Sequence, residues 1–433
     1  MDLLRNIFKG DKVIWIIFLC LCLISIIEVF SAASTLTYKS GDHWGPITQH
    51  SSILMVGVVV VVFMHNIPYK WFQAFPLFLY PLSIGLLAFV TLMGVITGDR
   101  VNGAARWMSF SGVQFQPSEI AKMAVIIVVA FILSKKQEDE GANPKAFKYI
   151  MILTGIVCML IAPENLSTAI LLFGVVFLMM FIGRVAAKKL LLLAGSIALT
   201  GVLGVLLLLA IPKDSDIPFL HRFDTWTARI EKFADKEEVP AAKFDIDKDA
   251  QIAHARIAIA TSNVVGKAPG NSVQRDFLSQ AFSDFIFAII IEELGLIGGG
   301  FVVMLYVWLL VRSGRIAQKC ERTFPAFLVM GIALLLVSQA ILNMMVAVGL
   351  FPVTGQPLPL ISKGGTSTLI NCAYIGMILS VSRYTAKLEK QKENGGLTPT
   401  LSQGEGEGNS ASEVQTAIEP TAKALNSDAE FEK

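Results

Sequence analysis

The sequence predicts an all-α polytopic membrane protein with about ten transmembrane helices and one long extracytoplasmic loop between spans seven and eight. Of its 433 residues, 54% are hydrophobic and only 16% are charged, whereas soluble domains carry about 25% charged residues. The mean hydropathy is +0.62, and the apolar blocks exceed the about 18 residues that indicate a membrane span. This composition excludes a soluble enzyme, a disordered chain and a nucleic-acid-binding protein. The net charge of +2 indicates no particular partner.

The apolar blocks give ten predicted spans in chain order. Their approximate bounds are 13–36, 48–65, 72–96, 118–134, 147–163, 168–183, 190–211, 284–311, 324–350 and 364–384. The first block lacks a small-residue cleavage pattern, so we expect an uncleaved first helix and not a removed signal peptide.

Lysine and arginine in the short loops predict the orientation, because cytoplasmic loops carry an excess of both. Nineteen lie in the set of loops that includes both termini, and four lie in the opposite set: Lys39, Arg100, Arg106 and Lys363. Both termini are therefore predicted to be cytoplasmic. Residues 1–12 form the predicted cytoplasmic N-terminus, residues 13–384 the ten-helix membrane domain, and residues 385–433 a tail that is disordered by composition.

The outer loop 212–283 is the one long connection in the predicted topology. Loops of this length without a domain-sized core tend to be functional. Within it, residues 250–264 predict a helix of low charge along the membrane surface, and Gly266, Pro269 and Gly270 predict a turn after it.

Ionisable side chains at membrane depth are costly, by about 2.5–3.5 kcal/mol on insertion scales, and tend to be functional. The first such cluster contains Arg106, Gln116, Glu119 and Lys122. Pro117 suits the first turn of the fourth span, which would place Glu119 and Lys122 on one helix face, where they can pair. The simpler interpretations are that Glu119 caps the helix and that Arg106 is an interfacial anchor.

Two further clusters are acidic. Glu164 and Thr168 lie in the short connection between spans five and six, where a simple turn would also explain them. Asp284 lies where the long loop enters span eight, and Glu292 and Glu293 follow in the same span. Ser283 or Asp284 would make a good N-cap. Adjacent carboxylates in an apolar span need partners or a wet cavity, and the three together predict an acidic site open to the outer leaflet.

The fourth cluster combines Asn343, the proline-rich stretch 351–359 and Lys363. Non-helical backbone at membrane depth is tolerated only inside protein or beside a water-filled cavity. Lys363 precedes two glycines at the start of span ten, so a cation and backbone N–H groups lie together, which suits phosphate. A plain helix start is the alternative.

The four clusters, in this order on ten spans, resemble the SEDS family (shape, elongation, division and sporulation), and within it the FtsW-type glycosyltransferases. The resemblance covers roughly residues 13–384. The matching motifs are Gly-Ala-Ala-Arg-Trp at 103–107, Gln-Pro-Ser-Glu at 116–119, Ser-Asp-Phe-Ile-Phe-Ala at 283–288 with Glu-Glu-Leu-Gly at 292–295, Phe-Pro-Val-Thr-Gly at 351–355, Leu-Pro-Leu at 358–360, and Gly-Gly-Thr-Ser at 364–367.

The resemblance implies polymerisation of lipid II into peptidoglycan strands outside the cytoplasmic membrane, with release of undecaprenyl diphosphate, at the division septum. It implies Asp284 as the catalytic general base. The implied substrate-binding residues are Arg106, Gln116, Glu119, Lys122, Glu164, Thr168 and Lys363. It also implies a class B penicillin-binding protein (a transpeptidase) and other division-complex proteins as partners. No cofactor is implied for certain, no metal ligands are assigned, and dependence on a divalent cation is left open.

Three departures from the family pattern stand out. Glu164 replaces the usual aspartate. The segment 279–283, Ser-Gln-Ala-Phe-Ser, lacks the usual glutamate and histidine before the catalytic aspartate, and the usual glycine pair is replaced near Asn263. The alternatives are a flippase for lipid-linked precursors, a non-enzymatic scaffold of a division complex and an ion-coupled transporter. A polymerisation assay with lipid II separates them from the enzyme.

Overall fold

The computed structural model of the chain describes residues 9–32, 45–96, 108–110, 113–139, 141–210, 246–278 and 281–395. Contacts divide the chain into two units, Met1–Leu388 and Glu389–Lys433. In the second unit only residues 389–395, the end of the last helix, are described. Everything below concerns the first unit.

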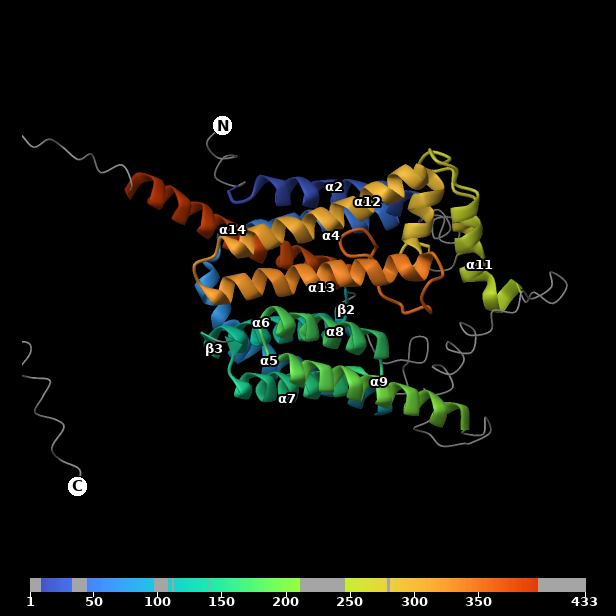
Figure 1. Cartoon of the computed structure of the whole chain (residues 1–433). Helices are drawn as coiled ribbons and strands as arrows, with labels where there is room; N and C mark the ends of the chain where they lie inside the picture. Colours follow the sequence, from blue (N-terminus) through green and yellow to red (C-terminus); the bar gives the residue numbers. More distant parts are fainter. Residues whose placement is uncertain are drawn as a thin grey trace, which may run out of the picture. The chain divides into compact units, whose positions relative to one another are not determined.

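Ten long helices account for the predicted spans (Figure 1). They are α2 (Lys12–Ala32), α4 (Gly45–Asn66), α5 (Phe75–Ile96), α6 (Pro117–Lys135), α7 (Pro144–Ile161), α8 (Leu166–Ile182), α9 (Ala187–Ala210), α12 (Ile286–Gln318), α13 (Thr323–Ala347) and α14 (Gly365–Gly395). Among the described residues, nine of these helices are long and apolar enough to cross a membrane, and α8 is a shorter apolar helix of 17 residues. The prediction of an all-α multi-span membrane protein is confirmed.

Short elements connect the long helices. A 3₁₀ turn, η1 (Tyr69–Gln73), precedes α5, and β1 (Met108–Phe110) pairs antiparallel with β2 (Val113–Phe115) just before α6. A second small antiparallel pair, β3 (Gln137–Glu138) and β4 (Gly141–Ala142), follows α6. In the long loop, α11 (Ile246–Ala260) corresponds to the predicted surface helix, and η3 (Gln274–Phe277) follows it.

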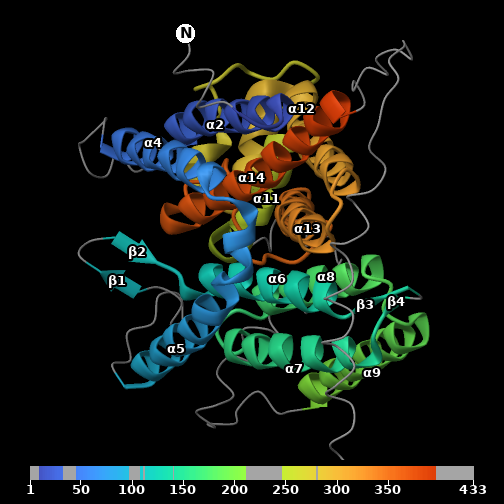
Figure 2. The same cartoon turned by 90° about the vertical axis from the view of Figure 1, so that its left-hand side faces the viewer.

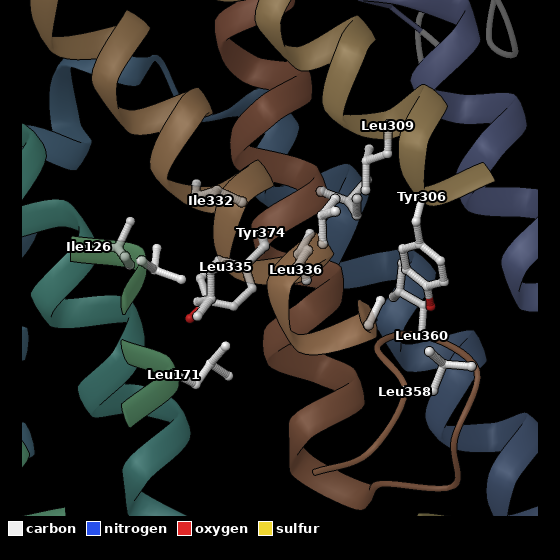
Figure 3. Packing of buried hydrophobic residues seen from close by; sticks show 14 of the residues in the cluster. Ile126, Leu171, Tyr306, Leu309, Ile332, Leu335, Leu336, Leu358, Leu360 and Tyr374 are labelled. Carbon is white, nitrogen blue, oxygen red and sulfur yellow. The ribbon is translucent and has the colours of Figure 1, made fainter. Parts of the chain in front are cut away.

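Helix α13 is central in the packing. It contacts α12 on one side and α6 and α8 on the other, while α5 and α7 pack against α6 (Figure 2). Figure 3 shows Leu335 of α13 in the buried cluster with Ile126 of α6, Leu171 of α8 and Tyr306 of α12. Polar side chains on α13 are therefore held among three other helices.

The outward faces of the peripheral helices are apolar, as a lipid-facing surface requires. Leu77 of α5, Met159 of α7 and Leu192 of α9 are 83%, 78% and 76% exposed. Exposed apolar surface of this kind is uncommon on soluble monomers. It therefore supports the membrane assignment independently of helix length.

Helix α12 differs from the predicted span 284–311 because it starts at Ile286 and is interrupted at Gly295, where φ is 72° and ψ is −175°. A segment of the long loop fills the interruption. Leu296 N–H donates to the carbonyl of Asn263 at 3.3 Å, and Lys267 N–H donates to the carbonyl of Glu292 at 3.1 Å. The loop thus satisfies backbone groups that the break would otherwise leave without partners.

Candidate functional site

Asp284 lies in a turn that precedes α12 and is not its cap. The cap position is taken by Phe285, without a side-chain cap hydrogen bond, so the expectation of an N-cap at Ser283 or Asp284 was wrong. The helix starts two residues later than predicted because residues 281–285 form the turn. The Asp284 side chain is half-buried, and Ser283 Oγ donates to its Oδ1 at 3.3 Å.

The backbone of this turn is held through three successive carbonyl groups, those of residues 282–284. Their donors are Lys363 N–H at 3.0 Å, Ser362 Oγ at 2.6 Å and Asn343 Nδ2 at 2.9 Å, in that order. The donors come from α13 and from the loop before α14. Because each buried carbonyl has a partner, the turn is well determined although it belongs to no helix or strand.

Lys363 of the fourth cluster lies beside the Asp284 turn. Its Nζ lies 5.7 Å from the centroid of the Phe282 ring, a cation–π arrangement. The side chain is half-buried, and this burial lowers the pKa of its ammonium below the ordinary lysine value. Lys363 precedes α14, which begins at Gly365, so a cation stands next to a helix N-terminus.

The predicted pair of Glu119 and Lys122 is confirmed: Lys122 Nζ lies 2.8 Å from Glu119 Oε1, and both side chains are buried. Lys122 Nζ also donates to Gln339 Oε1 of α13 at 2.9 Å. The capping alternative for Glu119 is wrong, since Gln116 occupies the cap position. Two of the three N–H groups of the ammonium therefore have partners inside the protein.

Two amides of α13, Gln339 and Asn343, connect these parts. Asn343 was named in the fourth cluster but without a role, and Gln339 was not named. Gln339 Nε2 donates to the carbonyl of Pro357 at 3.0 Å. Asn343 Nδ2 donates to the carbonyl of Gln356 at 2.8 Å. Their spacing of four residues in an apolar span, which places both on one helix face, is the signal in the sequence that could have identified them.

Thr168 of α8 joins the same region, whereas the side chain of Gln116, the cap residue of α6, bonds within its own segment. Gln356 Nε2 donates to Thr168 Oγ1 at 2.7 Å, and Asn165 caps α8 by accepting from Thr168 N–H at 3.2 Å. Gln116 Nε2 donates to Ser118 Oγ at 3.0 Å. The structure therefore brings five predicted residues close to the two α13 amides or to the loops they bind: Asp284, Glu119, Lys122, Thr168 and Lys363.

Glu164 lines a small pocket with Pro117, Ser118 and Asn165, against apolar side chains of α5 and α7. The pocket adjoins the first turn of α6, in which Glu119 directly follows Ser118. A direct contact of Glu164 with Lys122 stays a prediction. Arg106 lies outside the described residues, so its predicted role also stays a prediction.

Glu292 and Glu293 do not form an acidic site with Asp284 that opens outward, and this part of the prediction was wrong. Both side chains are fully buried. Glu292 accepts from Lys267 Nζ at 2.7 Å and from Val273 N–H at 3.2 Å, and Glu293 accepts from Ser272 N–H at 3.2 Å. The two carboxylates hold the long loop to α12, because the segment after α11 folds back and surrounds them with donors.

Glu28 of α2 was also missed. Its side chain is fully buried, and among the described residues neither carboxylate oxygen has a hydrogen-bond partner. Within the described residues, no group of three or more His, Cys, Asp or Glu side chains has the arrangement of a metal site.

Comparisons with known proteins agree with this picture. The family model described as "Cell cycle protein" (FtsW, RodA and SpoVE) matches residues 11–387. A probable peptidoglycan glycosyltransferase FtsW from Halomonas elongata is 31% identical over 87% of this chain and 91% of its own length. A protein of the same name from Geobacter metallireducens is 30% identical over 88% and 96%.

Two solved structures share the fold. A chain of a peptidoglycan synthase complex has a TM-score of 0.69 and 23% identity, over 87% of this chain and 99% of its own. The rod shape determining protein RodA of Thermus thermophilus has a TM-score of 0.58 and 21% identity, over 87% and 98%. With the family model matched over most of the chain, the protein belongs to the FtsW/RodA/SpoVE (SEDS) family of multi-span membrane proteins.

Proposed function

We propose that this protein is a peptidoglycan glycosyltransferase that polymerises lipid II at the outer face of the cytoplasmic membrane and releases undecaprenyl diphosphate. The observation that carries the proposal is the fixed turn at the junction of the long loop and α12, where Asp284 lies beside the cation Lys363. The names of the relatives, probable peptidoglycan glycosyltransferases, support it.

The geometry suits glycosyl transfer to a sugar hydroxyl. Asp284 removes the proton of the acceptor hydroxyl as its oxygen attacks the anomeric carbon. The bond from that carbon to the lipid diphosphate breaks, and the leaving group departs with its negative charge. Lys363 and the N-terminus of α14 stabilise this charge, together with the predicted cation Arg106.

The relatives support a proposal for the place and the partners of the reaction. We propose that the protein acts at the division septum, because the curated relatives carry the name FtsW. A peptidoglycan synthase complex among the similar structures supports a class B penicillin-binding protein as partner. With both termini in the cytoplasm, the Asp284 turn and the long loop lie on the outer face, where the substrate is presented.

The test is polymerisation of lipid II by purified full-length protein in liposomes. We expect glycan chains on a gel and release of undecaprenyl diphosphate. Asp284→Asn preserves the shape of the side chain but cannot accept the proton, so we expect a loss of about 10²–10⁴-fold in rate with unchanged thermal stability. A stable, fully active Asn variant removes Asp284 as the base. Wild-type protein that moves lipid II across the bilayer without making chains is a flippase, and protein that does neither is a scaffold.

A further inference from the structure

We propose that Asn343 is a positioning residue for the proposed general base, and that it acts by fixing the backbone carbonyl of Asp284. The inference rests on the proposed function. In this proposal Asn343 does not contact the substrate. Helix α13 positions Asp284 through the Asn343 side chain.

The amide of Asn343 joins two segments that are distant in the chain. Its Nδ2 donates to the carbonyl of Asp284 at 2.9 Å and to the carbonyl of Gln356 at 2.8 Å. The side chain is only 1% exposed, so neither bond competes with water. An asparagine amide nitrogen carries two N–H groups, and here both are used.

The carbonyl of Asp284 lies just before the first turn of α12. The first helical hydrogen bonds of that helix, from Ala288 and Ile289 N–H, go to the carbonyl of Phe285. The carbonyl of Asp284, one residue earlier, lies outside this first turn of the helix. Asn343 donates a hydrogen bond to this carbonyl, so its loss would remove a contact that holds the backbone of the residue proposed as the base.

The anchor itself is rigid. Asn343 lies on α13, which packs between α12 and the pair α6 and α8. One turn earlier, Gln339 binds the carbonyl of Pro357 and the ammonium of Lys122. The same face of α13 thus fixes the loop 356–357 at two points. Lys363 and Ser362 bind the carbonyls of residues 282 and 283, in that order, but they lie in the loop before α14 and not on a helix.

The Asn343→Ala variant keeps the carboxylate of Asp284. It loses the hydrogen bond to the Asp284 backbone carbonyl, which positions that carboxylate. A misplacement of about 1 Å at a reacting group can cost about 10²-fold. We expect kcat to fall about 10- to 100-fold while KM for lipid II changes less than about twofold, because the residue makes no substrate contact. A residue that only supports the fold would change Tm and both kinetic parameters together.

The decisive experiment is a double-mutant cycle of Asn343→Ala and Asp284→Asn in full-length protein, with kcat and KM measured by lipid II titration. If Asn343 acts through Asp284, Asn343→Ala lowers kcat in the wild type but by less than about twofold in the Asp284→Asn background. Ser380→Ala is the matched control. It also removes a buried side-chain hydrogen bond to a carbonyl, that of Ile67, and should leave kcat unchanged.

The outcomes separate the two proposals. A fully active Asp284→Asn protein overturns the assignment of the base, whatever Asn343 does. An inactive Asp284→Asn protein with a fully active Asn343→Ala protein overturns the positioning role alone, and so does an equal loss from Asn343→Ala in both backgrounds. If Asn343→Ala does not fold, Asn343→Asp, which keeps the volume and lacks the amide donor, replaces it in the cycle.

Discussion

The ion pair of Glu119 and Lys122 shows how one residue's partners constrain its role. The family resemblance implies Lys122 as a substrate-binding residue, and its charge would suit the lipid diphosphate. In the structure its ammonium is buried and bonded to Glu119 Oε1 and Gln339 Oε1. Its charge is therefore compensated inside the protein, and Lys363 is the more accessible of the two cations.

Removing one partner of this pair should cost far more stability than removing both. Glu119→Gln or Lys122→Met leaves a buried charge without compensation, which costs about 3–5 kcal/mol. The double variant buries no charge. We therefore expect thermal unfolding to show that it regains most of the stability that each single variant loses. A double variant as unstable as the sum of the single variants would contradict this. Its polymerisation rate then tests the diphosphate contact, because stability is no longer limiting.

The pair itself could be predicted because residues three apart on a helix face one another. The partners of Glu292 and Glu293 could not. Their donors, Lys267, Ser272 and Val273, come from a separate segment about 20 residues earlier, and no periodicity relates a loop to the helix it folds against. For the same reason the sequence indicated Asp284 as a candidate base and Asn343 as part of a polar cluster, but not the bond between them, which spans 59 residues.

At the scale of elements, the interruption of α12 is the feature that local propensity did not reveal. Gly295 has a positive φ, and a Cβ at this position would lie 2.3 Å from the carbonyl oxygen of Val264. A Cβ at Gly266, in the loop segment, would likewise lie 2.3 Å from the carbonyl oxygen of Glu293. Two glycines facing each other permit this close approach of two backbones.

Gly295→Ala is expected to destabilise the protein, because the new methyl group meets backbone that cannot move aside and because φ is unfavourable for alanine. Strain of this kind costs of order 1–3 kcal/mol, and the clash adds to it. Gly300→Ala, in the same helix with no atom within 4 Å of the added Cβ, is the matched control. For Gly300→Ala we expect the free energy of unfolding to stay unchanged or to rise by up to about 1 kcal/mol. Similar melting temperatures for the two variants would argue against the close approach.

At the scale of the whole molecule, counting apolar blocks predicted the long helices and their order in the described residues, where nine are long and apolar enough to span and α8 is shorter. The arrangement of the helices was not predictable. A span that is apolar on all sides has no amphipathic pattern, so its sequence does not indicate which helices it packs against. The central place of α13 between α12 and α6 is therefore visible only in the structure. The orientation follows from the loop charges and stays a prediction.

Cysteine labelling checks the orientation. We expect a membrane-impermeant maleimide to label Asn271→Cys in the long loop of intact spheroplasts, and to label Asp139→Cys between α6 and α7 only after permeabilisation. Both positions are exposed, and the five native cysteines are buried or half-buried. Labelling in the reverse order would place the Asp284 turn on the cytoplasmic face and would remove the proposed access of lipid II.

The stretch from Ile286 to the break at Gly295 is a helix fixed at both ends, by the carbonyls of residues 282–284 and by the loop around Glu292 and Glu293. An α-helix turns by about 100° per residue. A single inserted or deleted residue in this stretch would rotate one attachment away from its partners while the other stayed in place. The stretch should therefore accept changes of side chain far more readily than changes of length, and related sequences should align across it without gaps.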